Sequence, residues 1–294
     1  MVELVVLVGI PAAGKSHWAQ KMSEREGYSW VSSDNIRKNH DYDISNADVF
    51  AEMFDITKQN LRDGVNVIYD ATNLSAKRRA HLIGCIKSLK MNDIVLFRCE
   101  VFVAPIEVLK ERNANRSGVD CVPEEVIDRM VKNFQFPQYF EGWDFININD
   151  NSVGKLIRFG SMKGYDQHSK YHSLDLYEHS RAVVEKARKL NLPMVVSDAA
   201  WYHDIGKPFC RTEGDDGWAH YFGHENVSAY MLALDYVDSG YYSKDAFLSM
   251  VFIVNYHMRP YNWTQKSYEK DKDMFGEEYT HMLKLFHQCD ITAH

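Results

Sequence analysis

The segment GIPAAGKS, Gly9–Ser16, decides how the first half of this chain folds. It matches the pattern G-x-x-x-x-G-K-[ST], whose glycines allow the backbone to wrap around phosphate oxygens. A β-branched apolar run, Glu3–Val8, precedes the segment, and a helical pattern over Ser16–Glu26 follows it. A helix that starts directly after the loop points N–H groups and a partial positive charge at a bound phosphate. The segment therefore predicts a nucleotide phosphate-binding loop between a buried strand and a helix.

The residue types in this loop have separate expected tasks. Lys15 would neutralise the charge of the β- and γ-phosphates of ATP, and the Ser16 hydroxyl would bind Mg²⁺. The other contacts would come mostly from backbone N–H groups. The loop residues expected to contact ATP are Gly9, Ala12, Ala13, Gly14, Lys15 and Ser16.

Strand-like and helix-like segments alternate through residues 1–150. The expected strands are Glu3–Val8, Tyr28–Ser32, Val65–Tyr69, Ile94–Val103 and Phe145–Ile148. The expected helices are Ser16–Glu26, Ala47–Asp63, Ala76–Lys90 and Pro105–Arg116. Such alternation is typical of a parallel sheet with helices on both faces. We therefore expect an α/β domain over residues 1–150.

Three further features favour a kinase over other proteins with such a loop. Asp34 follows the second expected strand, where its carboxylate can accept the proton of an attacking hydroxyl while Arg37 holds a nearby phosphate. Asp70 stands at the carboxyl end of a strand, where open α/β sheets bind ligands, and can orient Mg²⁺ or its waters. Arg112 and Arg116 share a helix face or its frayed end, and can stabilise charge on the transferred phosphoryl group.

The segments GIPAAGKS, SSDNIR (32–37), DATN (70–73) and ERNANR (111–116) together resemble the phage polynucleotide 5′-kinase family and its bacterial relatives, over about residues 1–145. The resemblance implies that Asp34 is the general base for a 5′-OH and that Arg37 contacts the adjacent nucleotide phosphate. The lid arginines of that family map onto Arg112 and Arg116. The chain lacks the DxDxT phosphatase motif of the two-module phage enzyme, so a second activity of that haloacid-dehalogenase-like type is excluded.

Residues beyond 150 follow a different pattern, because strand signals fade and helical spacing takes over. The expected helices are Leu174–Leu190, Pro193–His203, His224–Val237, Lys244–Tyr256 and Phe275–Ala293. We expect a second, helical domain over residues 165–294, joined to the first by a linker at 151–164.

Histidine and aspartate recur through this second half in the order H…HD…H…H…D. Imidazole and carboxylate ligands suit Mn²⁺, Fe, Co²⁺, Ni²⁺ or Zn²⁺. The aspartate beside a histidine, Asp204, can bridge two metal ions, and two ions would activate a water and clamp phosphate oxygens. Lys207 can add positive charge near the phosphate or the leaving group. The candidate metal ligands are His179, His203, Asp204, His224, His257 and Asp290.

The strings YHSLDLYEHS (171–180), YHDIGKP (202–208) and FGHENVSA (222–229) resemble the HD phosphohydrolase superfamily, and most of all the HD module attached to some CCA-adding tRNA enzymes. The similarity spans about residues 165–294 and implies an all-α domain that binds one or two divalent transition metal ions. The core metal site that it implies consists of His179, His203, Asp204 and Asp290, and the second one of His224 and His257.

The composition, with 45% hydrophobic and 26% charged residues among 294, is that of a globular protein. No apolar run approaches the roughly 20 residues of a membrane span, so no membrane partner is expected. Five scattered cysteines without a CxxC pair favour a reducing cytoplasm. The net charge of −7 does not attract nucleic acid, so a polynucleotide would need a local patch. Candidates are Lys77–Arg79, Arg98, Arg112 and Arg116, although composition favours a solvated helix face.

These observations lead to one principal hypothesis, which is the healing of RNA or DNA ends. The kinase would transfer the γ-phosphate of ATP to a 5′-OH, and the HD module would remove a 2′,3′-cyclic phosphate or a terminal 2′- or 3′-phosphate. One alternative is nucleotide salvage by a nucleoside kinase with an HD nucleotidase. Another is a nucleotide sensor whose HD domain binds without hydrolysis. The sequence contains no signal for an oligomeric state.

Overall fold

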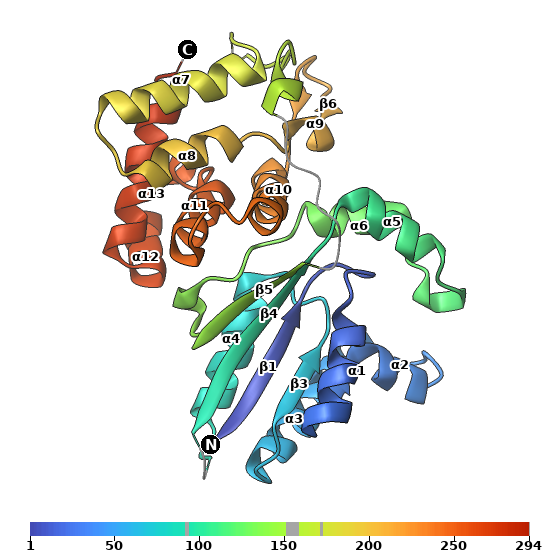
Figure 1. Cartoon of the computed structure of the whole chain (residues 1–294). Helices are drawn as coiled ribbons and strands as arrows, with labels where there is room; N and C mark the ends of the chain where they lie inside the picture. Colours follow the sequence, from blue (N-terminus) through green and yellow to red (C-terminus); the bar gives the residue numbers. More distant parts are fainter. Residues whose placement is uncertain (92–93, 151–158, 171–172, 294) are drawn as a thin grey trace. The chain divides into compact units, whose positions relative to one another are not determined.

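The computed structural model describes residues 1–91, 94–150, 159–170 and 173–293 (Figure 1). The chain forms two compact units: Met1–Ile127 with Pro137–Ser152, and Asp128–Phe136 with Val153–His294. Residues 151–158 of the expected linker 151–164 lie outside the described residues.

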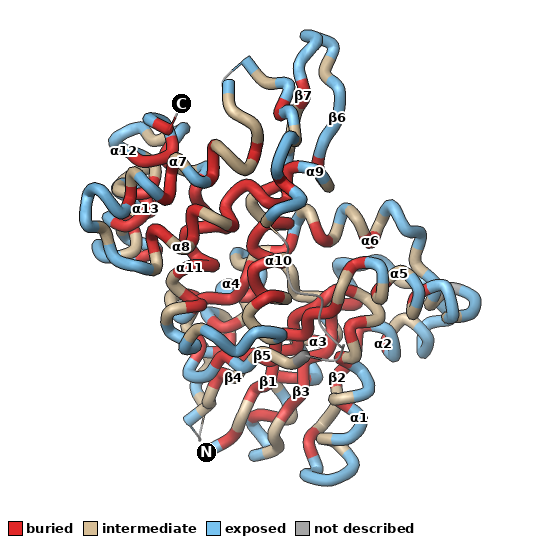
Figure 2. The backbone as a smooth tube through the Cα atoms, turned by 45° about the horizontal axis from the view of Figure 1, so that its top comes forward, coloured by how far each residue is buried: buried red, intermediate tan, exposed pale blue. Residues whose placement is uncertain are grey.

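The first unit is built on a parallel sheet of five strands in the order β2-β3-β1-β4-β5. The strands are β1 (Val2–Val8), β2 (Ser29–Ser32), β3 (Val67–Asp70), β4 (Val95–Val103) and β5 (Phe145–Asp150). The central strand β1 is fully buried from Leu4 to Val8, which is why its sequence is continuously apolar rather than alternating. Figure 2 shows this burial along β1, β3 and β4.

The register of the sheet brings three strand ends together. Leu7 of β1 pairs with Asp70 of β3, and Asp70 pairs with Ser32 of β2. Because the strands are parallel, the loops that follow them leave from the same edge of the sheet. The segments 9–16, 33–37 and 70–73 therefore start from this edge, and Asp70 lies at the carboxyl end of its strand, as expected from the sequence.

Helices flank this sheet. They are α1 (Lys15–Glu26), α2 (Ser33–Asn39), α3 (Asn46–Arg62), α4 (Ala76–Ser88) and α5 (Ile106–Ala114), with short 3-10 turns at Gly118–Asp120 (η1) and Tyr139–Glu141 (η2). Helix α6 (Glu124–Val131) contains the boundary between the two units, which falls after Ile127. Helices α2 and α6 are absent from the sequence prediction. The first is short and begins where the Ser32 side chain accepts the Asn35 N–H, which is a local cap rather than a hydrophobic pattern.

The second unit is helical, as expected, with buried residues concentrated along α8, α10 and α11 (Figure 2). Its helices are α7 (Leu176–Lys189), α8 (Met194–Tyr202), α9 (Lys207–Cys210), α10 (His224–Ser239), α11 (Lys244–Tyr256), α12 (Gln265–Phe275) and α13 (Glu277–Asp290), with 3-10 turns at Phe159–Met162 (η3) and Pro260–Asn262 (η4). A small antiparallel hairpin, β6 (Thr212–Glu213) and β7 (Ala219–His220), is an addition to the expected all-α arrangement.

Two details of the second unit differ from the sequence prediction. The expected helix Phe275–Ala293 is present as α13 over Glu277–Asp290, and Gly276, with a φ of 86°, separates it from α12, which the sequence does not predict. The segment Asp128–Phe136 belongs to this unit rather than to the α/β unit. Its aromatic rings explain why, since Phe134 packs edge-on against Tyr230 with ring centroids 5.1 Å apart.

In the described part of the chain, no helix is both long and apolar enough to span a bilayer.

Candidate active sites

The loop after β1 has the backbone conformation that its glycines allow. Gly14 has a φ of 100° where α1 begins, and Ala12 also has a positive φ, 66°. Gly9 lies so close to β4 that a Cβ atom would sit 2.8 Å from the Phe102 carbonyl oxygen. A side chain would clash at Gly9 and would strain the backbone at Gly14. The structure therefore explains why glycine stands at both positions of the motif.

Lys15 is held at the base of the loop. Its buried ammonium donates to the carbonyl oxygens of Gly9 (2.9 Å) and Ile10 (3.0 Å). Burial lowers the pKa of Lys15, while the carboxylates of Asp70 and Asp34 act in the opposite direction. Because the Lys15 ammonium has little contact with water, it is well suited to bind a nucleotide phosphate.

Ser16 and Asp70, the residues expected at a Mg²⁺ ion, are adjacent. Ser16 Oγ donates to Asp70 Oδ2 at 3.0 Å, and Trp30 Nε1 donates to the same oxygen at 3.0 Å. Burial raises the pKa of Asp70, against the effects of Lys15 and of these two donors. Hydroxyl and carboxylate oxygens are ligands that Mg²⁺ prefers, so the pair fits that ion.

Asp34 and Arg37 lie one turn apart on α2. Arg37 Nη1 donates to Asp34 Oδ1 at 3.1 Å, and Nη2 donates to Asn46 Oδ1 at 3.0 Å. The Asp34 side chain remains 61% exposed. An incoming hydroxyl can therefore reach the carboxylate, while its charge still acts on buried Lys15.

Two positions were expected for Arg112 and Arg116, a shared helix face or the frayed end of the helix, and the structure has the second. Helix α5 ends at Ala114, so Arg112 lies on the helix and Arg116 in the turn after it. Arg116 Nη1 donates to the carbonyl oxygen of Asp120 at 3.2 Å. Its charge adds to the effect of burial, which lowers the pKa of Lys15.

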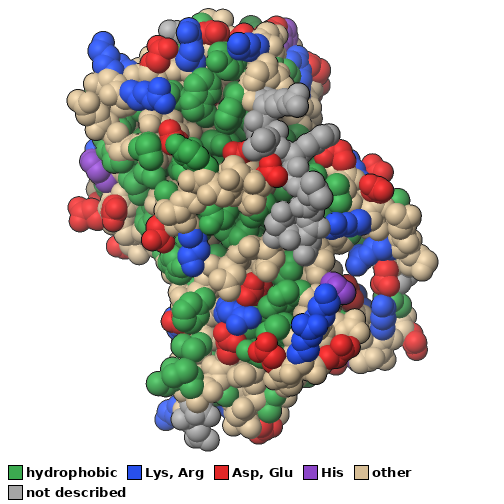
Figure 3. Space-filling view, viewed as in Figure 1, with side chains coloured by type: hydrophobic (Ala, Val, Ile, Leu, Met, Phe, Trp, Pro, Cys, Tyr) green, Lys and Arg blue, Asp and Glu red, His purple; other side chains and the backbone are tan. Residues whose placement is uncertain are grey.

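The basic patch considered from the sequence loses two of its members. Arg79 is buried and forms a bidentate ion pair with Glu141, with both N–O distances at 2.7 Å. Arg98 pairs with Glu3 at 3.3 Å. On the face shown in Figure 3, Lys and Arg side chains are interspersed with Asp and Glu rather than gathered. Arg79 is a structural residue whose burial makes it available neither to such a patch nor to the solvated helix face that composition favoured.

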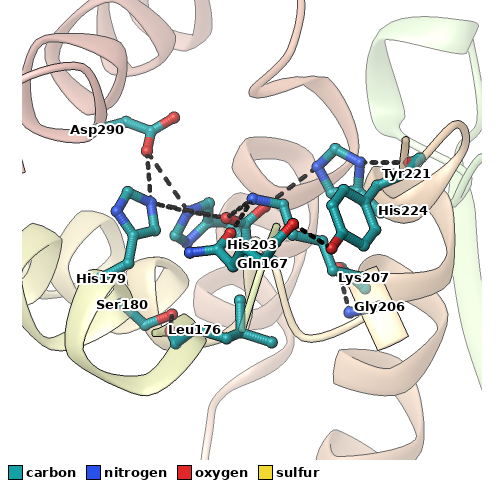
Figure 4. Close-up of polar contacts among 12 residues, drawn as sticks. Gln167, Leu176, His179, Ser180, His203, Gly206, Lys207, Tyr221, His224 and Asp290 are labelled. Atoms are coloured by element: carbon teal, nitrogen blue, oxygen red, sulfur yellow. Dashed lines mark hydrogen bonds and ion pairs between the residues drawn. The ribbon is translucent and has the colours of Figure 1, made fainter. Parts of the chain in front are cut away.

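All six candidate metal ligands of the second unit are buried, and their ligand atoms form clusters that share Asp204. Figure 4 shows His179, His203, His224 and Asp290 at this centre. His179 comes from α7, His224 is the first residue of α10, and Asp290 is the last residue of α13. His203 and Asp204 form the turn after α8, and His257 caps the end of α11.

Asp204 divides the ligands into two groups, because its two oxygens face different histidines. Oδ2 lies 3.2 Å from His203 Nε2 and 3.6 Å from His179 Nε2. Oδ1 lies 3.1 Å from His224 Nε2 and 3.8 Å from His257 Nε2. We call His179, His203, Asp290 and Asp204 Oδ2 the first ligand group. The second ligand group consists of His224, His257 and Asp204 Oδ1.

Each of the four histidines has its Nδ1 at a backbone carbonyl oxygen. The partners of His203, His224 and His257 are 2.8 Å away, and that of His179, the Ala293 carbonyl, is 3.2 Å away. A carbonyl only accepts, so Nδ1 carries the hydrogen and the neutral ring turns the lone pair of Nε2 towards the centre. This is the arrangement in which histidine binds metals.

The spacing of the ligand atoms also fits divalent metal ions. The Nε2 atoms of His179 and His203 are 3.3 Å apart, and those of His224 and His257 are 3.2 Å apart. Ligands about 2.1 Å from one tetrahedral or octahedral ion are separated by roughly 3.0–3.4 Å. Unprotonated nitrogens that face each other at this distance repel unless a proton or a metal ion lies between them. Each ligand group therefore fits one ion, with Asp204 as the bridge.

The electrostatics of the centre favour a positive charge in the first ligand group. Burial disfavours charged His203, but Asp204 and Asp290 outweigh it and raise its pKa to about 10. Burial alone would raise the pKa of Asp204, yet His203 and Lys207 hold it well below the usual range. For His257, burial and the neighbouring histidines lower the pKa to about 3.

Lys207 points at the bridging carboxylate. Its Nζ donates to Asp204 Oδ2 at 2.6 Å and to Gln167 Oε1 at 2.7 Å (Figure 4). Gly206 before it packs against α10, where a Cβ atom would lie 2.6 Å from the His224 carbonyl oxygen. The close approach at Gly206 thus sets the distance between Asp204 and His224.

Several residues that shape the two sites were missed in the sequence. Trp30, Asn46, Gln167 and Tyr261 each hydrogen-bond a candidate site residue. These four residues lie nine to forty positions away from their partners along the chain, and none of the four belongs to a motif. Gly206 also shapes its site, and the sequence could have indicated it, because it stands inside the HDIGK string.

Comparison with known proteins gives the same division of the chain. Residues 4–137 match a family model described as an AAA domain, and residues 176–291 match one described as an HD domain. A gluconokinase structure from Sinorhizobium meliloti 1021 is 19% identical and aligns over 50% of this chain and 82% of its own, with a TM-score of 0.36. A fungal RNA kinase is 14% identical over 80% of this chain and 97% of its own, with a TM-score of 0.40. From the two family matches and the two folds, the chain joins a kinase-like P-loop domain to an HD phosphohydrolase domain.

Proposed function

We propose that this protein heals nucleic-acid ends, with a kinase that phosphorylates a 5′-OH and an HD phosphohydrolase that removes a 2′,3′-cyclic or terminal 2′- or 3′-phosphate. The observation that carries the kinase half is the exposed Asp34–Arg37 pair, whose carboxylate acts on the Lys15 ammonium of the phosphate loop. The observation that carries the HD half is the pair of ligand groups bridged by Asp204.

The proposed phosphoryl transfer uses residues at one edge of the sheet. Asp34 accepts the proton of the 5′-OH as its oxygen attacks the γ-phosphorus of ATP. Arg37 binds the phosphate next to the acceptor ribose, which sets the direction of attack. Lys15, with Arg112 and Arg116, stabilises the charge on the transferred phosphoryl group and on the leaving ADP. Ser16 and Asp70 would hold the Mg²⁺ ion.

In the second unit, bound divalent ions would supply an activated water and polarise the phosphate oxygens. The chain contributes the geometry for this chemistry. The backbone carbonyls keep a hydrogen on each histidine Nδ1, so every Nε2 remains available as a ligand. The Lys207 ammonium fixes Asp204 and adds positive charge where a substrate phosphate would bind.

The pairing of activities has a chemical reason. RNA-cleaving nucleases that form 2′,3′-cyclic phosphates leave a 5′-OH on the other fragment. Neither end can be joined by a ligase that needs a 5′-phosphate and a free 3′-OH. One chain with both proposed activities would convert both ends of the same break.

The test supplies labelled ATP with a 5′-OH RNA oligonucleotide, the matching DNA and free nucleosides. A parallel assay supplies an oligonucleotide with a 2′,3′-cyclic phosphate and one with a 3′-phosphate, across Mn²⁺, Co²⁺, Ni²⁺ and Zn²⁺. We expect label on the oligonucleotide 5′ end and metal-dependent opening or release of the terminal phosphate. Labelling of nucleosides alone would replace this proposal with nucleotide salvage.

A further inference from the structure

Tyr261 contacts the metal centre without being one of its candidate ligands. It lies in the turn η4, and its hydroxyl donates to Asp290 Oδ2 at 2.8 Å. The ring stacks edge-on against His287, with centroids 4.5 Å apart, and the residue remains 46% exposed. Its hydroxyl therefore reaches a buried carboxylate from the protein surface.

This hydrogen bond decides which Asp290 oxygen faces the histidines. With Oδ2 engaged by Tyr261, Oδ1 lies 3.1 Å from His179 Nε2 and 3.5 Å from His203 Nε2. A carboxylate on a single Cβ can rotate, so a donor on one oxygen fixes the direction of the other. Lys207 also donates to a candidate aspartate ligand, but it binds Asp204 Oδ2, the oxygen that itself faces His203. Tyr261 instead binds the Asp290 oxygen that does not face the histidines.

The turn that carries Tyr261 is itself held from both sides. Arg259, two residues before Tyr261, forms an ion pair with the buried carboxylate of Asp271 on α12. Trp263, two residues after it, donates its Nε1 hydrogen to Asp271 Oδ2 at 2.9 Å. One carboxylate therefore ties down both ends of η4. These contacts restrict the backbone on both sides of Tyr261.

We propose that Tyr261 is a positioning residue of the first ligand group, which holds Asp290 as a one-oxygen metal ligand through its hydroxyl. Asp271 supports it by fixing the turn η4. The inference rests on the metal-binding role proposed above. Because the Tyr261 hydroxyl donates to Asp290, a member of the first ligand group, its loss should weaken that metal site and leave the His224–His257 site unchanged.

The test titrates the full-length protein with Mn²⁺ and counts bound ions from the electron paramagnetic resonance signal of free Mn²⁺. For Tyr261→Phe we expect one class of site to lose roughly 10–100-fold in affinity, the usual effect of removing an outer partner of a metal ligand. The other class keeps its affinity. Asp271→Asn should move the same class in the same direction by a smaller factor.

Tyr242→Phe is the matched control, because the Tyr242 hydroxyl donates to Asp198 at 3.2 Å in the same unit and neither residue belongs to the ligand groups. It should leave both classes unchanged. Equal affinities for Tyr261→Phe and the wild type would overturn the proposal, and so would equal weakening of both classes. A wild type that binds no Mn²⁺, Co²⁺, Ni²⁺ or Zn²⁺ would instead reject the proposed metal centre itself.

A kinetic measurement separates positioning from substrate contact. If Tyr261 acts through Asp290, saturating Mn²⁺ restores the phosphohydrolase kcat of Tyr261→Phe to near the wild-type value and leaves KM unchanged. A KM for the phosphorylated oligonucleotide that stays raised at saturating Mn²⁺ would contradict the positioning role.

Discussion

The phosphate loop and the metal centre differ in how their functional atoms are distributed along the chain. The loop takes most of its atoms from the consecutive segment Gly9–Ser16, whose conformation follows from its own glycines. The metal centre joins His179 to Asp290, 111 positions away. A local site depends mainly on its own backbone, whereas a dispersed site depends on the packing of every helix that carries a ligand. Substitutions should therefore affect the two sites in different ways.

The largest expected effect is that of Asp204→Ala, because each of its oxygens serves one ligand group. Both metal sites should be lost together, with a larger fall in phosphohydrolase rate than the roughly 10–100-fold of an outer-partner change. Mn²⁺ binding and phosphate release measure the two effects, and 5′-phosphorylation by the same preparation should be unchanged. A variant that still binds one ion at wild-type affinity would show that Asp204 is not the bridge.

Asp34→Asn tests the local site in the same way. We expect the rate of 5′-phosphorylation to fall by roughly 10²–10⁴-fold, the usual contribution of a general base. ATP affinity should be unaltered, because the loop does not need Asp34 for its conformation. Asp55→Asn, an exposed carboxylate on α3, is the control. Equal kinase rates for the two variants would remove Asp34 from the mechanism.

Glu141→Gln tests whether the stability of the first unit also depends on a contact between residues that are far apart in the sequence. It leaves the buried Arg79 guanidinium without its carboxylate, while Arg79 Nη1 still donates to the Asn73 carbonyl oxygen behind Asp70. Breaking a buried pair in this manner costs about 3–5 kcal/mol, measured by urea unfolding.

The comparison for this variant is Glu178→Gln, which breaks the exposed pair with Arg181. That change should cost only about 0–1 kcal/mol. If both variants unfold at the same urea concentration, the Arg79–Glu141 pair has no special importance for the fold.

The smallest expected effect is that of Gly206→Ala, which introduces a methyl group beside the His224 carbonyl oxygen. Overpacking of this kind costs about 1–3 kcal/mol and should displace α10 from Asp204. We expect a lower melting temperature together with weaker Mn²⁺ binding in the second ligand group. Gly160→Ala, which has open space around its Cβ position, is the control in the same unit. Weakening confined to the first ligand group would contradict this account.

The sequence predicted the parts of the molecule that depend on neighbouring residues. The apolar run of β1, the glycines of the loop and the position of Asp70 at a strand end all follow from local pattern, and the structure has them. The sequence did not predict helix α12, because its residues are mostly polar and do not form an apolar stripe. Of these residues, only Asp271 and Phe275 are buried. Helix α2 was not predicted because a side-chain cap, rather than an apolar stripe, starts it.

For the metal centre, the sequence by itself determined which residue types are present and in what order. Only the tertiary structure decided that Asp204 directs one oxygen to each histidine pair, that Tyr261 holds Asp290, and that Arg79 is buried instead of available to a polynucleotide. These features depend on side-chain directions across helices that are far apart in sequence. Periodicity and motifs describe the backbone near a residue, whereas a hydrogen bond or ion pair over such separations exists only once the helices have packed.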